Sequence, residues 1–178
     1  AQKYDAVVTN PPYMGAAGMN VKLYDFVKDI YPDTKSDMST ICMDKTLAMC
    51  NEHGYMAMIN IPVWMFISSY EKLRSKIIRN NTLVEMLHLG RGVFGSDFGT
   101  TAFVIKKKYI ENYSGTYRKL FIKQGAVDSV ETKETLFFEG KGEFVQKQAS
   151  YLSIPGNPIA YWVSERFISN FSNRLVKD

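Results

Sequence analysis

Short apolar runs separated by amphipathic stretches are the main pattern along this chain. Four runs rich in apolar or β-branched residues predict strands, namely Tyr4–Thr9, Tyr55–Ile61, Thr82–Leu89 and Thr100–Lys107. The first two runs are almost continuously hydrophobic, which is typical of parallel strands covered on both faces. We therefore expect a sheet that is buried between layers of other elements.

Helical periodicity is found between these strands. A helix is predicted from about Asp37 to Glu52, with Ser36 or Asp37 as its capping residue and Gly54 after its end. A second helix is predicted after a capping box formed by Ser68 and Glu71. Its apolar stripe consists of Leu73, Ile77 and Ile78.

The order of these elements is strand, helix, strand, helix, strand, and the fourth strand follows a Gly-rich link with no helix before it. The last two strands therefore form a predicted hairpin. The fold class is α/β, with a mostly parallel sheet that contains one antiparallel strand. From about Gly125 the chain becomes polar, and residues 128–143 are interpreted as a linker or surface excursion.

The end of the chain predicts one more helix, with Asn157 as its capping residue and Pro158 as its first helical residue. Its apolar face would comprise Ile159, Trp162, Phe167 and Phe171. We expect this helix to lead into a further region that this chain does not contain. Its aromatic side chains would then have lost their cover, so we expect an exposed apolar patch there.

Composition narrows the class of protein. The chain has 178 residues, of which 46% are hydrophobic, and a net charge of +4. This mild basicity permits a nucleic-acid partner without requiring one. Two cysteines, Cys42 and Cys50, and two histidines have no metal-ligand spacing, so no metal is expected. The sequence has no signal peptide and no apolar run long enough for a bilayer, and we expect a soluble protein of a reducing compartment, with no membrane partner.

The stretch Val7–Gly15, VVTNPPYMG, ends a predicted parallel strand with two prolines. Proline cannot donate to a strand ladder and fixes its own φ, so Pro11 and Pro12 form a rigid corner. In open α/β sheets, ligands bind at the carboxyl ends of the strands. The Asn10 side chain and the Pro11 backbone each present a carbonyl oxygen at this position.

Two neighbouring acceptors suit an amino group with two N–H donors. The exocyclic amine of a base is a poor nucleophile, because its lone pair is delocalised into the ring. Acceptance of both hydrogens favours a tetrahedral nitrogen with an available lone pair, which is preorganised electrostatic catalysis. Tyr13, just beyond the corner, can stack on a base rotated out of a duplex.

The segment Asp5–Tyr13 resembles the catalytic motif of S-adenosylmethionine-dependent amino-methyltransferases. The stretches NPPYMG, YPDTKSDM, WMFISSYEKLR, LHLG, TTAFV and IPGNPIAYWVSE resemble, in the same order, the large adenine-specific DNA methyltransferases of bacterial phage-exclusion (BREX) systems, the PglX type. The resemblance covers most of the chain. It implies that Asn10, Pro11, Pro12 and Tyr13 are catalytic, with Asn10 and Pro11 on the adenine amine and Tyr13 stacked on the flipped base.

The resemblance also implies an aromatic residue on the other side of the base, and Phe94 is the first candidate, with Phe98 second. For either residue, hinge packing is an alternative role. In such enzymes the cofactor, S-adenosylmethionine, lies on a glycine-rich turn upstream of the motif, whereas only nine residues precede Asn10 here. The segment Gly90–Gly95 matches G-x-G-x-x-G, but a predicted strand follows it instead of a helix, so the match is interpreted as coincidental.

These observations predict the C-terminal half of a doubly wound, Rossmann-like class I methyltransferase sheet in residues 1–124, without the glycine-rich cofactor turn. Residues 125–178 would form a linker and the start of a region leading to target recognition. The expected partners are double-stranded DNA with a flipped adenine and other phage-defence proteins, in the bacterial cytoplasm. The chain alone is expected to bind S-adenosylmethionine weakly or not at all, and to be inactive.

Two other functions are compatible with the same corner. The amine could belong to a protein glutamine or to an RNA base, or the chain could be a non-catalytic DNA-binding or assembly module. The basic residues Lys106–Lys108 could bind DNA phosphates or form a solvated strand end. The residues Trp64, Met65, Phe66 and Tyr70 could line a base pocket or belong to the core.

Overall fold

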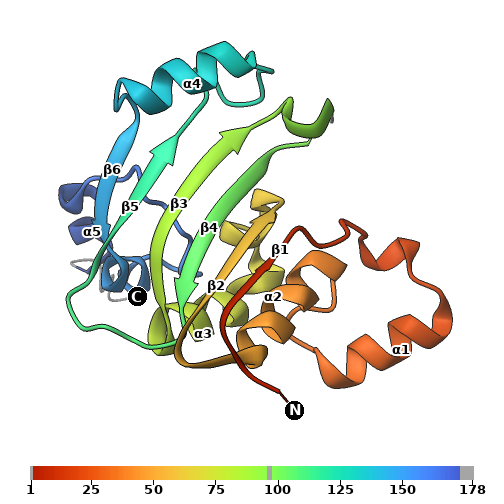
Figure 1. Cartoon of the computed structure of the whole chain (residues 1–178). Coiled ribbons are helices and arrows are strands. Elements are labelled where there is room, and N and C mark those ends of the chain that lie inside the picture. The colour runs from red at the N-terminus through yellow and green to blue at the C-terminus, as the bar shows by residue number, and fades with distance from the viewer. Residues whose placement is uncertain (1, 96–97, 173–178) are drawn as a thin grey trace, which may run out of the picture.

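The computed structural model describes residues 2–95 and 98–172. They form a six-stranded sheet with the strand order β1-β2-β4-β3-β5-β6 (Figure 1). The strands are β1 (Tyr4–Thr9), β2 (Cys50–Asn60), β3 (Thr82–Gly90), β4 (Thr100–Lys106), β5 (Ser114–Lys119) and β6 (Glu143–Lys147). The α-helices are α1 (Val21–Ile30), α2 (Met38–Met49), α3 (Glu71–Asn80), α4 (Val130–Phe138) and α5 (Glu165–Ser172). The short 3₁₀ turns are η1 (Ala16–Gly18), η2 (Pro62–Met65), η3 (Ser68–Tyr70), η4 (Val93–Gly95) and η5 (Gln148–Ser153).

The strand directions agree with the predicted sheet. β1 is parallel to β2, and β3 is parallel to β5. β4 lies between β2 and β3 and is antiparallel to both, which confirms the hairpin of the third and fourth predicted strands. β6 is antiparallel to β5, so a second strand runs in the reverse direction. All four predicted strands are present, and β5 and β6 extend the sheet beyond them.

One face of the sheet carries the core. Met58, Phe103, Met86 and Tyr117 are register partners across β2, β4, β3 and β5, and each is at most 3% exposed. Helices α2 and α3 pack on this face (Figure 1). The predicted stripe of α3 is confirmed, because Leu73, Ile77 and Ile78 are all buried.

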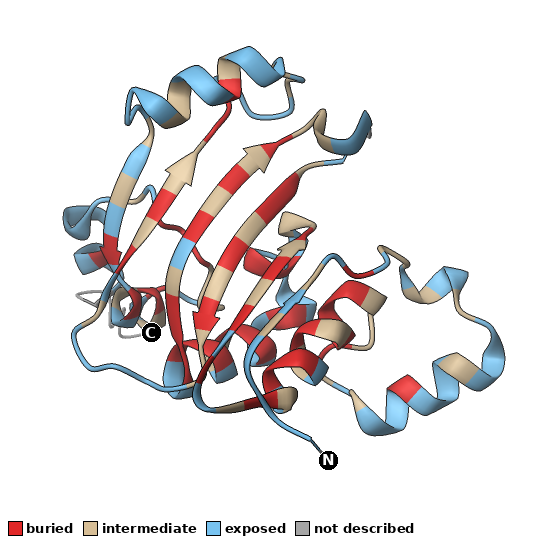
Figure 2. Cartoon of the chain, in the orientation of Figure 1, coloured by how far each residue is buried: buried red, intermediate tan, exposed pale blue. Residues whose placement is uncertain are grey.

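The opposite face of the sheet is partly uncovered, whereas the sequence predicted strands covered on both faces. β1 is an edge strand, and its Val8 is 76% exposed. Within the described residues, this face holds a hollow of about 660 Å³ that crosses the sheet from Val8 to Phe137. Its apolar lining includes Val8, Ala57, Ile59, Leu87, Ala102 and Val104. We call this surface the bare face of the sheet, and the exposed and half-buried strand positions are visible in Figure 2.

Helix α2 has the predicted start and a shorter length. Asp37 is its N-cap, and one carboxylate oxygen accepts a hydrogen bond from the Ser39 backbone N–H at 2.8 Å. The helix ends at Met49, and Cys50 is the first residue of β2, so the two cysteines do not share a helix. With 12 residues, α2 is the longest described helix, and no helix in the described ranges is long and apolar enough to span a bilayer.

Two predicted helix starts were wrong. α3 begins at Glu71 directly after η3, and no side chain caps it, so Ser68 and Glu71 do not form a capping box. Asn157 has φ of 49° and lies in a turn instead of a helix cap, and the last helix begins at Glu165. The turn forms because Gly156, with φ of 79°, and Asn157 both adopt left-handed conformations, which Gly and Asn tolerate best.

Structure is also present where none was predicted. Helix α1 follows the N-cap Asn20, whose side-chain oxygen accepts from the Leu23 N–H at 2.9 Å. Figures 1 and 2 show α1 beside the β1 end of the sheet and mostly exposed, and only Val27 on it is buried. Residues 128–143, interpreted as a linker or surface excursion, contain α4 and the first residue of β6. The apolar patch expected near the end is present, because Trp162 and Phe167 are 45% and 52% exposed, although Ile159 is buried.

Candidate active site at the carboxyl edge of the sheet

The proline corner lies where β1 ends. Thr9 pairs with Met58 of the parallel strand β2, so Asn10 emerges at the carboxyl edge of the sheet. Pro11 is buried, whereas Asn10 and Pro12 are exposed. The buried ring anchors the corner and the Asn10 side chain remains accessible, as ligand binding at this edge requires.

The Asn10 amide is held by a neighbouring hydroxyl. The Tyr13 hydroxyl lies 2.7 Å from Asn10 Oδ1, to which it donates, and 3.2 Å from the Ile59 carbonyl oxygen of β2. Burial raises the pKa of Tyr13, so the hydroxyl keeps its proton at neutral pH. Because a carbonyl oxygen has two lone pairs, Asn10 Oδ1 can accept a second hydrogen bond from a ligand. The contact therefore orients Asn10 without blocking it.

The aromatic neighbour of Tyr13 is Phe98, the second sequence candidate for the residue on the other side of the base. The Phe98 ring meets the Tyr13 ring edge-on, with 5.5 Å between ring centroids. Phe94 is 66% exposed and has φ of 57° within η4, and it makes no ring contact with Tyr13 in the described ranges. The structure thus brings Asn10, Tyr13 and Phe98 together. The stacking roles of Tyr13 and Phe94 on a base remain predictions.

A row of polar side chains continues from this corner along the same edge. Asn60 pairs with Thr101, Thr101 with His88, and His88 with Lys119, across β2, β4, β3 and β5. Asn60 is fully buried, and its Oδ1 accepts from the Ile61 N–H at 2.7 Å. Sequence reasoning did not single out Asn60 or His88. The available signal was a polar residue at the carboxyl end of an otherwise apolar strand.

The glycine fingerprint at Gly90–Gly95 does not form a cofactor turn. It leads into the short turn η4 and then into β4 at Thr100, so no helix N-terminus points at a phosphate there. Packing requires Gly90, because a Cβ atom at this position would lie 2.9 Å from the Phe121 ring, and its φ is 69°. The interpretation as a coincidental match is confirmed.

The aromatic segment after β2 is divided between core and surface. Trp64, Met65 and Tyr70 are buried in the core cluster, which confirms the packing alternative for these residues. Phe66 is 38% exposed and contacts the Trp162 ring at 5.5 Å between centroids.

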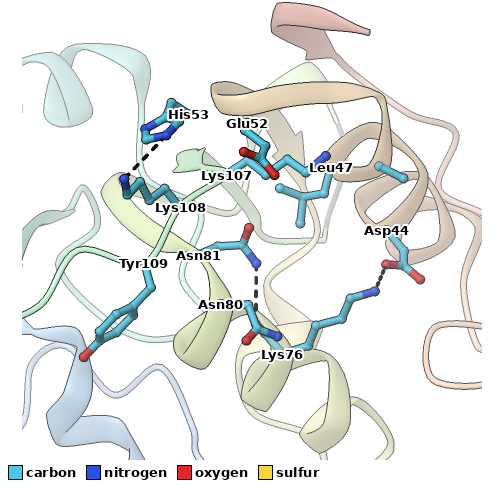
Figure 3. A pocket seen from close by; sticks show the side chains of 11 residues that line it. Asp44, Leu47, Glu52, His53, Lys76, Asn80, Asn81, Lys107, Lys108 and Tyr109 are labelled. Carbon is cyan, nitrogen blue, oxygen red and sulfur yellow. Dashed lines mark hydrogen bonds and ion pairs between the residues drawn. The ribbon is translucent and has the colours of Figure 1, made fainter. Parts of the chain in front are cut away.

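The lysines of the predicted basic cluster lie at the opposite edge of the sheet. Because β4 is antiparallel to β1, its last residue, Lys106, is at the amino ends of the parallel strands. Lys106 Nζ donates to the Tyr55 hydroxyl at 2.7 Å, and Lys107 Nζ donates to the Cys50 carbonyl oxygen at 2.7 Å. Lys108 Nζ lies 3.4 Å from His53 Nε2, beside a hollow of about 600 Å³ (Figure 3). These intramolecular contacts favour a structural role.

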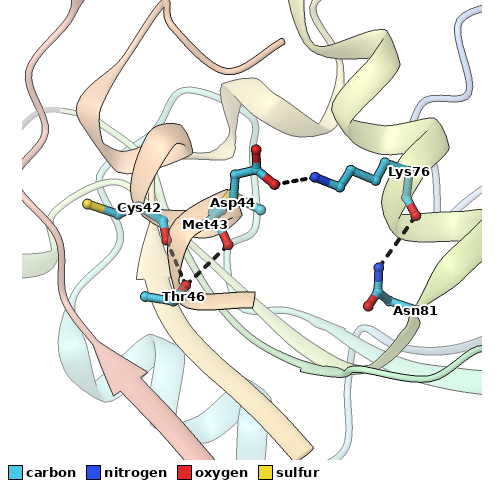
Figure 4. Close-up of polar contacts among 6 residues, drawn as sticks. All are labelled: Cys42, Met43, Asp44, Thr46, Lys76 and Asn81. Atoms are coloured by element: carbon cyan, nitrogen blue, oxygen red, sulfur yellow. Dashed lines mark hydrogen bonds and ion pairs between the residues drawn. The ribbon is translucent and has the colours of Figure 1, made fainter. Parts of the chain in front are cut away.

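Side chains that line this second hollow connect α2 to α3. Lys76 and Asp44 form an ion pair between the two helices, and the Thr46 hydroxyl donates to the Cys42 carbonyl oxygen at 2.7 Å (Figure 4). Burial, followed by the charge of Asp37, raises the pKa of the Cys42 thiol, so this cysteine is not activated as a nucleophile.

Comparisons with known proteins identify the family of this chain. The family model of the Eco57I restriction-modification methylase matches residues 1–94, which include the corner. The chain is 42% identical over 176 residues to the adenine-specific methyltransferase BrxX of Escherichia coli O9:H4 (strain HS), covering 96% of this chain and 14% of that protein. It is 35% identical to the adenine-specific methyltransferase PglX of Lacticaseibacillus casei (strain Zhang), covering 93% of this chain and 14% of that protein.

A solved structure shares the fold. The methyltransferase subunit of a type I restriction-modification system from Streptococcus thermophilus matches with a TM-score of 0.60 at 14% identity, covering 88% of this chain and 37% of that chain. The chain thus corresponds to a portion of a methyltransferase fold, as predicted, and its resemblance to the PglX-type proteins is confirmed. It belongs to the Eco57I restriction-modification methylase family.

Proposed function

We propose that this chain is part of a site-specific DNA methyltransferase that transfers a methyl group from S-adenosylmethionine to N6 of adenine, in phage defence or restriction-modification. The observation that carries the proposal is the contact between Tyr13 and Asn10 Oδ1 at the end of β1, at 2.7 Å. It holds an amide acceptor on the residue that precedes the rigid Pro11. Membership of a methylase family and two relatives named adenine-specific methyltransferases support it.

In the proposed reaction, Asn10 Oδ1 and the Pro11 carbonyl accept the two hydrogens of the adenine amine. The nitrogen becomes tetrahedral, its lone pair forms the new N–C bond, and one amine proton passes to water. S-adenosylmethionine, when bound, supplies the methyl group as its S–C bond breaks. The Tyr13 hydroxyl positions Asn10, which lowers the cost of organising the site at the moment of reaction.

The glycine fingerprint of the described residues does not form a cradle for this cofactor. Gly90–Gly95, the one glycine fingerprint found in the sequence, leads to a strand, so it offers no helix N-terminus for binding. We propose that the cofactor is held mainly by residues upstream in the full-length protein. The curated relatives are long enough for this, because the chain spans 14% of each.

The proposed macromolecular partner is double-stranded DNA with one adenine rotated out of the stack. Tyr13 and either Phe98 or Phe94 would stack on that base. Residues 125–178 would lead toward target recognition, and other phage-defence proteins are further proposed partners. The chemistry of the corner suits any planar amine, so the substrate class needs its own experiment.

In the test, the full-length protein and its phage-defence partners are incubated with S-adenosylmethionine that carries a tritium-labelled methyl group. DNA, RNA and protein from a methylation-deficient host are offered separately as substrates. Label in DNA, released as N6-methyladenine, is the expected result. Label in RNA or in protein glutamine would replace the proposed substrate, and no label in any fraction would support a non-catalytic module.

A further inference from the structure

A third cavity lies on the same edge of the sheet as Asn10. It has a volume of about 390 Å³ and is walled mainly by rings. Phe121 and His88 form part of the wall, with their rings edge-to-face at 4.8 Å between centroids, and both are at most 6% exposed. The two partly exposed rings are those of Phe66 and Trp162. Cavities of this size with apolar walls and few polar groups are typical of small-ligand sites.

The wall of this cavity is rigid. Tyr161 stacks on Tyr117 with 5.2 Å between centroids and an interplanar angle of 6°, and its hydroxyl lies 3.0 Å from His88 Nδ1. The Trp162 ring meets Tyr161 edge-on at 4.9 Å. Because Tyr161 is 1% exposed and held on several sides, it supports the Trp162 ring, which in turn contacts the Phe66 ring. Preorganised rings lose little conformational entropy when a ligand stacks on them.

A cation and an amide lie among these rings. Lys119 Nζ is 4.9 Å from the centroid of the Phe121 ring and lines the cavity, as does the exposed Gln124. Apolar rings beside a lysine are the combination that binds single-stranded nucleic acid, with stacking for the base and positive charge for the phosphate. An amide can bond to the donor and acceptor edge of a base.

The sheet sets the distance of this cavity from the proposed catalytic corner. His88 on β3 and Lys119 on β5 are register neighbours. In the sheet, β3 lies three strand spacings from β1, and β5 lies four strand spacings from β1. At about 4.8 Å per spacing, the cavity is about 14 to 19 Å from the corner. One strand of DNA rises about 3.4 Å per nucleotide, so the two sites are about four to six nucleotides apart.

We propose that this cavity binds a second, unpaired nucleobase of the DNA strand, stacked on the exposed ring pair of Phe66 and Trp162 with its phosphate near Lys119. The inference rests on the proposed function, which identifies the bound nucleic acid as the DNA strand that carries the target adenine. It adds a base-binding site outside the catalytic corner. Its role is to hold DNA in register while the target base occupies the corner.

The test uses the full-length protein and a 16-nucleotide single-stranded oligothymidylate that carries 5-iodouracil at one position. Irradiation at long wavelength joins this base to an aromatic side chain that stacks on it, and peptide mapping by mass spectrometry identifies the residue. We expect adducts on Trp162 or Phe66. The double variant Phe66→Ala, Trp162→Ala should lower the affinity for the oligonucleotide about tenfold, because stacking contributes about 1–3 kcal/mol per base.

The matched control is Phe167→Ala, because Phe167 is also an exposed phenylalanine in this region, at 52%, but it does not line the cavity. It should bind the oligonucleotide within twofold of wild type. Adducts that map only to other segments, or an unchanged affinity in the double variant, would overturn the inference. The variant Asn10→Ala distinguishes the two proposals, because it should lose methylation and keep the adducts. If the wild-type protein forms the adducts but does not methylate DNA, the base-binding cavity stands and the proposed reaction is refuted.

Discussion

Arg74 and Gly156, 82 positions apart, are joined by two hydrogen bonds, from Arg74 Nε and Nη2 to the Gly156 carbonyl oxygen at 3.0 and 2.7 Å. Nη1 of the same guanidinium donates to the carbonyl oxygens of Trp64 and Ile67. Arg74 is 1% exposed, and burial lowers its pKa. One buried side chain therefore ties α3 to the segment after β2 and to the turn before Pro158.

Replacement of Arg74 by methionine should lower the free energy of unfolding of this chain by about 3 kcal/mol. The change removes the donor from one buried carbonyl oxygen, that of Trp64, and from two partly buried ones, those of Ile67 and Gly156. Loss of a partner costs about 1–3 kcal/mol for a buried group and less for a partly buried one. Urea denaturation followed by circular dichroism measures the difference. Arg79→Met on the exposed side of the same helix is the control, and equal losses for the two variants would contradict the proposed clamp.

His88 gives the protein a specific dependence on pH. Burial, followed by the charge of Lys119, lowers the pKa of His88 from 6.5 to about 4. Between these values the unfolded chain binds a proton that the folded chain does not, so the stability falls as pH decreases from 6.5 to 4. The total loss from this group is about 3 kcal/mol.

The measurement compares the free energy of unfolding of wild type and His88→Gln at pH 7.5 and pH 4. Other titrating groups contribute to both proteins, so the difference isolates His88. Wild type should lose about 3 kcal/mol more than the variant over this interval. Parallel curves would show that His88 titrates normally in the folded state.

Part of the fold follows directly from local sequence. The apolar run Tyr4–Thr9 is a strand with the predicted bounds, and Asp37 caps α2, because each signal depends only on near neighbours. The corner at Asn10–Tyr13 was identified for the same reason, since paired prolines end a strand whatever surrounds them.

Tertiary contacts determined what the sequence did not predict. β5, with the sequence SGTYRK, has few apolar residues and is a strand because it pairs with β3 on one side and β6 on the other. Phe98, not Phe94, lies against Tyr13. Local sequence did not distinguish the two phenylalanines, because both have similar neighbours in the loop. The bare face was unexpected, because an apolar strand indicates burial without showing which segment supplies the cover.

The bare face predicts self-association of the isolated chain. Val8 is 76% exposed on an edge strand, beside an apolar hollow, and such surfaces attract other copies. Val8→Lys should shift the sedimentation profile toward monomer. Val130→Lys, at a 62% exposed valine that does not line this hollow, should leave the profile unchanged. A wild-type chain that is monomeric at tens of micromolar would be inconsistent with this prediction.

The isolated chain should bind S-adenosylmethionine weakly or not at all. The reason is structural, because the glycine fingerprint at Gly90–Gly95 leads into a strand and offers no phosphate- or cofactor-binding helix. Calorimetric titration of residues 1–178 with the cofactor tests this directly. A dissociation constant in the micromolar range would show that these residues hold a cofactor site of their own.

The catalytic role of Asn10 is tested most directly by the content of N6-methyladenine in DNA. A methylation-deficient host expresses the full-length protein with its partners, as wild type, Asn10→Ala or Asn80→Ala, and mass spectrometry quantifies the modified base. Asn80 is an exposed asparagine beside the hollow at the opposite edge, so its variant should match wild type. Asn10→Ala should lower the signal about 100-fold or more, because one preorganised hydrogen-bonding group of a transition state is lost. Wild-type methylation by Asn10→Ala would contradict the assignment of the corner.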